Sequence, residues 1–330
     1  MKNALLLGIA SFALIACSGE SSVDTANVEK AVQTAAADET VKEAVEVAIE
    51  AGSIEAVLAG AWRSDRNKAR DAFRNPAETL AFFGVEPGQT VVEISPGRGA
   101  WYTEVLAPYI AAGGGTYIGA TNGDPEFNTA FLEKFGDEAI FGQVQVGVLG
   151  GEGIEPGTVD TVLTFRNIHN WMRGNTEADV FANAYAALKP GGVFGVIEHR
   201  LPSGAEQDPQ GGSGYVHQDY AIALGEAAGF QLAGTSEINA NPKDTADHPF
   251  GVWTLPPASF AGNDDNPAPE GFDAAAYKAI GESDRFTLKF VKPASATTGA
   301  VTDAVQKAAS DVEEKAKSAA DVVEGSGAGS

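Results

Sequence analysis

Residues 91–110 read VVEISPGRGAWYTEVLAPYI, and this stretch decides the fold of the chain around it. Residues 91–94 form a short apolar run that is typical of a buried strand, and residues 95–99 break it with Pro and Gly. Apolar residues then return at helical spacing, although Pro108 should end or kink this helix early. We therefore predict a strand, a glycine turn and a helix in direct succession. In such a unit the backbone of the turn can approach a small-molecule ligand.

Glu93 lies near the end of the predicted strand, ahead of Gly97 and Gly99. A carboxylate at this place suits an amine or a hydroxyl group better than a phosphate, and the lysine of a phosphate-binding loop is absent from the turn. The pattern resembles motif I of class I S-adenosylmethionine-dependent methyltransferases, in which an acidic residue precedes three alternating glycines. Ser95 occupies the first glycine position, so the match is partial. An ordinary tight turn between a strand and a helix is the alternative interpretation.

Apolar runs alternate with helical segments along the rest of the chain. Strands are expected at residues 116–121, 144–149, 159–165, 193–198, 231–238 and 285–291, and helices at residues 125–135, 176–188 and 218–228. A further helix should start at Pro76 and stop at Gly84, with Asn75 as its cap and Glu78 closing a capping box. Regular alternation with short connections predicts a parallel sheet with helices on both faces.

Further segments extend the resemblance to that superfamily. They are LKPGG at 188–192 and VDTVLTFRNIHNW at 159–171. The middle of the chain, residues 61–293, resembles a family of uncharacterised predicted methyltransferases through AETLAFFGV at 77–85, SGYVHQDY at 213–220 and NPKDTADHPFGVWTLPP at 241–257. The resemblance implies a Rossmann-like, seven-stranded, mostly parallel sheet with helices on both faces and an antiparallel last strand. It also implies S-adenosyl-L-methionine as the cofactor.

Ligands of open parallel sheets bind beyond the carboxyl ends of the strands, which directs attention to the residues that follow each strand. The resemblance implies that the cofactor is held by Glu93, Ser95, Gly97, Gly99, Asn122 and Asn167. The family pattern expects an acidic residue after the second strand to bind the ribose hydroxyls, whereas this chain has Ala120-Thr121-Asn122. Asn122 or Asp124 could take that place.

The four histidines all lie between residues 169 and 248. We expect His169, Tyr215 and His217 to border the substrate pocket as base or hydrogen-bond donors. The alternative is that each histidine only satisfies loop backbone or caps a helix. A metal site could also be built from His199, His217, Asp219 and His248. No pair has the spacing of a helical zinc site and no cysteine is available, so no metal is predicted.

The formal net charge of −23 opposes nucleic acid or an anionic membrane surface as the main partner. The middle of the chain remains acidic when the two outer segments are left out, so the charge is not confined to the ends. A small-molecule substrate is therefore expected. The sequence gives no indication of the oligomeric state.

The first 17 residues, MKNALLLGIASFALIAC, have Lys2, an apolar core and a small residue before Cys17, and are too short for a membrane span. This secretory signal ends in a sequence that resembles the lipobox of bacterial lipoproteins, in which the cysteine becomes the lipidated first residue. Ser18 stands where an aspartate would retain the protein at the inner membrane. We expect an exported protein, lipid-anchored to the cell envelope on the periplasmic side, at the outer membrane. An ordinary cleaved signal peptide is the alternative.

Composition divides the chain into a lipoprotein signal at 1–16, an acidic Ala/Glu-rich spacer at 17–60, the methyltransferase-like domain at 61–293 and an Ala-rich acidic tail at 294–330. Trp62, Arg63 and Arg66 open the domain, either as a cluster over the cofactor or as a solvated basic face. Two functions remain in competition. The polar loop FRNIHNW favours a methyltransferase acting on a small molecule or an envelope component. Ser95 and the missing ribose acid favour a non-catalytic lipoprotein that uses the fold as a ligand-binding module.

Overall fold

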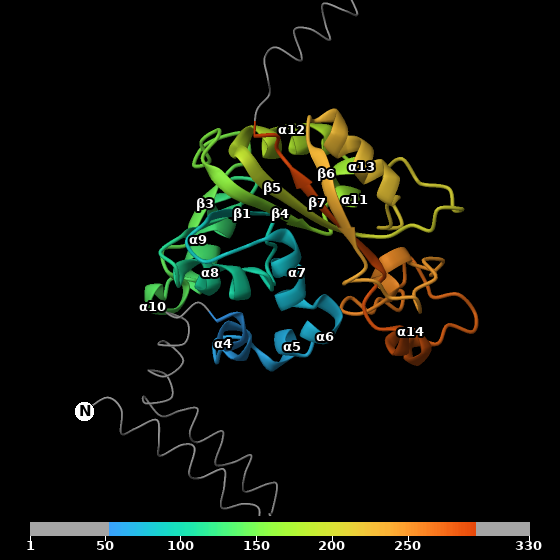
Figure 1. The fold of residues 1–330 in the computed structure, drawn as a ribbon. Helices are drawn as coiled ribbons and strands as arrows, with labels where there is room; N and C mark the ends of the chain where they lie inside the picture. The colour runs from blue at the N-terminus through green and yellow to red at the C-terminus, as the bar shows by residue number, and fades with distance from the viewer. Residues whose placement is uncertain (1–52, 295–330) are drawn as a thin grey trace, which may run out of the picture. The chain divides into compact units, whose positions relative to one another are not determined.

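The computed structural model describes residues 53–294. The predicted signal, Cys17, residues 18–52 of the spacer and residues 295–330 of the C-terminal tail lie outside these residues. The described part contains a seven-stranded sheet in the order β3-β2-β1-β4-β5-β7-β6 (Figure 1). The strands are β1 (Thr90–Ile94), β2 (Thr116–Ala120), β3 (Gln145–Gly147), β4 (Val159–Phe165), β5 (Leu188–His199), β6 (Gln231–Ser236) and β7 (Arg285–Val291). Only β7 runs antiparallel to its neighbours, β5 and β6. The predicted Rossmann-like fold is confirmed.

Helices cover both faces of the sheet, with α8 and α9 on one side and α12 and α13 on the other (Figure 1). The helices are α4 (Ile54–Ala59), α5 (Asp65–Lys68), α6 (Asp71–Arg74), α7 (Pro76–Phe83), α8 (Thr103–Ala111), α9 (Pro125–Lys134), α10 (Glu138–Phe141), α11 (Ile168–Met172), α12 (Glu177–Ala187), α13 (Gln218–Ala227) and α14 (Ala274–Ile280), with a short 3-10 turn η2 (Gly251–Thr254). None of the described helices is long and apolar enough to span a bilayer.

The central strands are apolar along their length because both of their faces are covered. Four consecutive residues of β1 are buried, as are five at the end of β4, whereas the edge strand β6 alternates between exposed and half-buried positions. In register, Ile94 lies beside Ala120 of β2 and Thr164 of β4, and Phe165 lies beside Ile197 of β5. The carboxyl ends of these four strands are therefore level, which brings the residues that follow them together.

Helix α8 continues past Pro108 to Ala111. Of the two outcomes predicted for this proline, an early end or a kink, the early end is wrong. A proline has no N–H to donate to the carbonyl four residues back, which here is that of Glu104. The indole Nε1 of Trp62 donates to this carbonyl at 3.0 Å and satisfies it from outside the helix. The helix therefore keeps its last turn because a tertiary contact replaces the missing hydrogen bond.

Helix α7 begins at Pro76 as predicted and ends at Gly84, whose φ is 75°. Asn75 does not cap it, which corrects the predicted capping box. Asn75 is itself left-handed, with a φ of 41°, and its Nδ2 donates to the carbonyl of Ile238 at 2.6 Å. The side chain thus fastens the start of α7 to the loop after β6 rather than to its own helix.

Two further boundaries differ from the sequence prediction. The LKPGG segment belongs to β5, because Leu188 pairs with Val159 and the register shifts before Val193 pairs with Thr161. The segment is thus an irregularity within the strand rather than a separate turn. Helix α4 lies before the predicted start at residue 61, and its Val57 is fully buried. Packing of this helix places the start of the folded unit inside the predicted spacer.

Candidate functional site

A cavity of about 350 Å³ lies at the carboxyl ends of β1 and β4, where the order of the strands reverses. Crevices at this point of open α/β sheets bind ligands. Its walls come from four parts of the chain. They are residues 95–101 after β1, residues 165–169 around the end of β4 with His199 of β5, residues 252–258 and 282–283 before β7, and Arg70 and Arg74 of the N-terminal helices.

The turn after β1 forms the floor of this cavity. Ser95, Gly97 and Ala100 have φ values of 51°, 67° and 47°. Ser95 thus keeps the left-handed backbone that the first glycine of the motif would adopt, and its N–H donates to the carbonyl of Ala120 at 2.8 Å. A Cβ added at Gly97 or Gly99 would meet no atom within 4 Å. A side chain at either glycine would enter open space where a ligand can lie.

Glu93 lies behind the turn and lines neither of the cavities at this edge of the sheet. It is 3% exposed, and its Oε2 accepts hydrogen bonds from Tyr117 Oη at 2.6 Å and Thr103 Oγ1 at 2.9 Å. Burial raises the pKa of this carboxyl group to about 7. The geometry makes Glu93 a hydrogen-bonded support between β1, β2 and α8, and the side chain does not line the cavity where the sequence predicted that it holds the cofactor.

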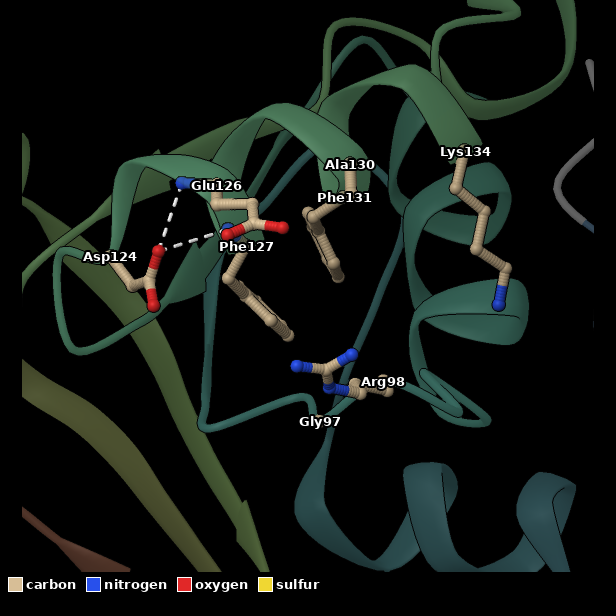
Figure 2. A pocket seen from close by; sticks show the side chains of 8 residues that line it. All are labelled: Gly97, Arg98, Asp124, Glu126, Phe127, Ala130, Phe131 and Lys134. Carbon is tan, nitrogen blue, oxygen red and sulfur yellow. Dashed lines mark hydrogen bonds between the residues drawn. The ribbon is translucent and has the colours of Figure 1, made fainter.

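A second hollow of about 310 Å³ shares Gly97 with the main cavity and lies beneath α9 (Figure 2). In Figure 2 the Arg98 guanidinium points toward the ring of Phe127, and Lys134 lies at the far end. Asp124 also lines this hollow, while its Oδ1 caps α9 by accepting the N–H groups of its second and third following residues. Asn122 lines neither cavity, and its Oδ1 accepts from the Asp124 N–H at 3.2 Å. Of the two predicted substitutes for the ribose-binding acid, Asp124 lines one of these two cavities and Asn122 lines neither.

His169 and Glu198 form a buried pair where β4 and β5 end. The Nδ1 of His169 lies 3.1 Å from Glu198 Oε1. The carboxylate is fully buried and also accepts the N–H groups of Ile168, at 2.6 Å, and His199, at 2.8 Å. A carboxylate with only acceptor atoms assigns the proton of the imidazole to Nδ1. In the neutral imidazole, the Nε2 of His169, a residue that lines the cavity, is then the hydrogen-bond acceptor.

His199 also lines the cavity, with its Nδ1 hydrogen-bonded to Ser283 Oγ. Burial lowers the pKa of His199 well below its usual value, and the neighbouring His169 and Arg166 act in the same direction. His199 is therefore neutral. Together with Glu198 these histidines place three potential metal-ligating atoms within 4.8 Å of one another. The carboxylate oxygen atoms of Glu198 already accept hydrogen bonds from two backbone N–H groups and an imidazole, and these compete with a metal ion for the same oxygen atoms.

The other predicted site residues are dispersed. Asn167 lines the cavity, and its Nδ2 donates to the carbonyl of Ile94 and to Thr164 Oγ1, both at 3.1 Å, which ties the end of β4 to that of β1. Tyr215 is fully buried, with its hydroxyl on Asp244, and is not among the residues that line the cavity. His217 starts α13, with its Nε2 on the carbonyl of Ala205, and also lies outside it. Of the three predicted catalytic residues, the structure brings only His169 into the cavity.

The metal set considered from the sequence does not come together. His199 bonds to Ser283, whereas His248 Nε2 lies 2.7 Å from Asp244 Oδ1 in a separate loop cluster. His217, as described, bonds to backbone. His199 is the last residue of β5, whereas His217 precedes α13 and His248 lies in the loop before η2, so each side chain has its own hydrogen-bond partner.

Two residues of the predicted N-terminal cluster, Trp62 and Arg63, have structural roles. Arg63 is buried and makes two hydrogen bonds to Asp71, at 2.7 and 2.6 Å, and Trp62 bonds to α8 as described above. Arg66 is exposed. None of the three lines the main cavity, although Arg70 and Arg74 from the same segment do. The prediction of a solvated basic face is therefore wrong for Arg63, whose side chain is buried.

Sequence reasoning missed the charged wall of the cavity. Glu282 is buried and accepts hydrogen bonds from Arg70, at 2.7 Å, from Arg74, at 3.0 Å, and from Arg285, at 3.2 Å. Burial acts to raise the pKa of Glu282, but the arginines outweigh it and lower this pKa to about 2. Arg70 and Arg74 are more than 200 positions from Glu282 in the sequence, so no local pattern points to these two partners. One feature of the sequence could have pointed to Glu198 as a site residue, because it is a charged residue at the end of an otherwise apolar strand.

No known family profile matches the chain, and no curated protein is detectably similar to it in sequence. Among solved structures, a SAM dependent methyltransferase from Aquifex aeolicus is 14% identical, with a TM-score of 0.42 over 68% of this chain and 93% of that one. The cyclase SpnF is 13% identical, with a TM-score of 0.45 over 67% and 81%. Phosphoethanolamine N-methyltransferase 2 of Haemonchus contortus, solved with S-adenosyl-L-methionine, is 16% identical, with a TM-score of 0.43 over 67% and 53%. The fold assignment rests on the strand order itself.

Proposed function

We propose that the protein is an S-adenosylmethionine-dependent methyltransferase that acts on a small molecule or a cell-envelope component. The observation that supports this most is that one cavity, at the reversal of the strand order, combines an open glycine turn with a histidine held by a buried carboxylate. The turn supplies a place for a cofactor, and the histidine supplies a base. The acidic chain makes nucleic acid an unsuitable acceptor.

The residues of the turn suit the cofactor. Gly97 and Gly99 leave open space above the backbone, and Asp124, which lines the adjoining hollow, would hold the ribose hydroxyls. When bound, S-adenosylmethionine supplies a methyl group on a positively charged sulfur atom and leaves as a neutral thioether. Asn167 fixes the spacing between the ends of β1 and β4, so it positions the cavity walls.

His169 then acts as general base. Its Nδ1–H is held by Glu198, so its Nε2 can accept the proton of an acceptor hydroxyl or amine as the methyl group arrives. His199 is neutral beside it and does not repel the imidazolium that forms. A buried carboxylate that holds the tautomer of a catalytic imidazole is the arrangement of a serine protease triad, in which replacing the carboxylate costs about ten-thousandfold in rate.

The test is calorimetric titration of the full chain with S-adenosylhomocysteine. Gly99→Ala should weaken binding at least tenfold, because its Cβ enters the open space while the backbone φ requires no glycine. Gly204→Ala is the matched control, since its Cβ also meets nothing within 4 Å but lies outside the cavity. It should bind as wild type does.

The competing function is a non-catalytic lipoprotein that uses the fold to bind another ligand, which the absence of an acidic side chain at residues 120–122 favours. A folded wild-type chain that fails to bind S-adenosylhomocysteine at millimolar concentration would support that alternative and sink the methyltransferase proposal.

A further inference from the structure

The charged wall of the cavity carries more positive charge than its own carboxylate neutralises. Arg70, Arg74 and Arg166 line the cavity, and Glu282 is the one acid among its lining residues. Arg285 adds a further guanidinium behind Glu282. This excess of positive charge occurs in a chain of formal charge −23, so it is a local feature of the cavity rather than a general property of the surface.

Arg74 is the most exceptional of these residues. It is 0% exposed and lies over the ring of Trp101 at 4.7 Å, with its Nε on Glu282. Its Nη1 and Nη2 have no hydrogen-bond partner among the described residues. Burial lowers the pKa of Arg74 to about 9, with Arg166 acting in the same direction, so the side chain is still charged at neutral pH. Buried donors without partners are costly, and a bound anion would satisfy them.

Arg166 supplies the second half of the site. It follows β4 directly, with a φ of 63°, and its side chain lines the cavity. It is only partly buried and makes no side-chain hydrogen bond to any described residue. The guanidinium is therefore available to a ligand. Arginine binds carboxylates and phosphates through two parallel N–H donors, which gives such a site both strength and orientation.

We propose that the cavity binds a small anionic substrate, with its carboxylate or phosphate between Arg74 and Arg166 and the group to be methylated facing His169. This inference rests on the proposed function and specifies its substrate class. An anion neutralised by two guanidinium groups is a poor nucleophile, so the anion orients the substrate and a separate hydroxyl or amine accepts the methyl group. The bond from that atom to the methyl carbon forms, the carbon–sulfur bond breaks with its electron pair on sulfur, and the acceptor proton passes to His169.

The probe is inorganic phosphate, titrated into the full chain at constant ionic strength. Trp101 and Trp253 both line the cavity, so tryptophan fluorescence reports occupancy, and calorimetry gives the stoichiometry. One saturable site is expected. Arg166→Gln should weaken phosphate binding about tenfold or more, as expected for the loss of charge-assisted hydrogen bonds. Arg173→Gln removes an exposed arginine that does not line the cavity and should leave binding unchanged.

Arg166→Lys keeps the charge but loses the paired donors, so its affinity for phosphate should lie between those of wild type and Arg166→Gln. This variant replaces Arg166→Gln in the test if the latter does not fold. No saturable phosphate binding to the folded wild type, or equal affinity in wild type and Arg166→Gln, would overturn the proposal.

The anion could instead be the carboxylate of the cofactor, and competition separates the two sources. Phosphate that displaces S-adenosylhomocysteine but not 5′-methylthioadenosine, which lacks a carboxylate, would overturn the assignment to the substrate. Phosphate binding that persists with S-adenosylhomocysteine in place would support it. Phosphate binding in a chain that takes neither adenosine compound would sink the proposed function and leave the anion site standing.

Discussion

At the scale of single residues, the carboxylates of this domain are placed in contrasting surroundings. Glu93 has neutral hydroxyl partners, Glu198 has backbone N–H groups and an imidazole, and Glu282 has arginines. Environment rather than residue type therefore decides the role of each. Two of these contrasts lead to measurable predictions.

Glu198→Gln should change the tautomer of His169. The amide of the glutamine can donate to Nδ1, which moves the imidazole proton to Nε2 and removes the acceptor that a base needs. Nitrogen-15 NMR of the histidines should show this exchange, and methyl transfer should fall by orders of magnitude while S-adenosylhomocysteine still binds. Glu226→Gln, at an exposed position, is the control. An unchanged His169 tautomer would contradict the assignment of Glu198 as its positioning partner.

The stability of the protein should fall as the pH rises, because the carboxyl group of Glu93 is harder to ionise in the folded state than in the unfolded state. Its folded pKa of about 7 lies above the ordinary 4.5, so its contribution to stability is full below pH 4.5 and is lost as the pH rises through 7. Glu93→Gln should remove this loss. The free energy of unfolding of wild type should therefore fall between pH 5 and pH 8 by about 1–3 kcal/mol more than that of Glu93→Gln. Denaturant unfolding at both pH values tests it. Parallel pH curves for the two proteins would rule the explanation out.

At the scale of elements, the alternation of apolar and helical segments predicted the position of each described strand, most clearly for the central parallel strands, because a strand buried on both faces needs a continuous apolar sequence. The bounds of β7 match the prediction, and those of β2 differ by one residue. The candidate site was less predictable. Its glycine turn, Asn167 and His169 follow strands directly and were found, whereas Arg74 and Glu282 meet only through the packing of distant segments. The effect of Pro108 was mispredicted for the same reason, since the compensating hydrogen bond comes from Trp62, in the turn between α4 and α5.

The contact between Trp62 and the carbonyl of Glu104 can be tested through that proline. Trp62→Phe leaves the carbonyl without its donor and should cost about 1–3 kcal/mol of unfolding free energy. Pro108→Ala restores an N–H to the helix, so in that background Trp62→Phe should cost less. Urea denaturation of the four proteins of this double-mutant cycle gives the coupling. Purely additive losses would show that the indole N–H does not compensate for the proline.

At the scale of the whole molecule, the described residues form a single sheet domain. The lipobox-like sequence that ends at Cys17 predicts that a lipid anchor holds the protein at the membrane. One acyl chain gives marginal membrane binding and several hold firmly, so a fully lipidated Cys17 should keep the protein in the membrane fraction. Detergent partitioning of wild type and Cys17→Ser is the measurement. If both proteins partition equally, the anchor lies elsewhere or does not exist.

The ion pairs between Glu282 and the arginines of the N-terminal helices also set an order of events during synthesis. Arg74 leaves the ribosome more than 200 residues before its carboxylate partner. Until then its guanidinium has no anion to hold it in place, and contacts across such a separation form late in folding. A nascent or prematurely terminated chain that ends before β7 could build much of the sheet, yet its pocket would lack one wall. Under the proposed function, binding of an anionic substrate therefore requires that the chain has been synthesised past Glu282, which completes this wall of the cavity.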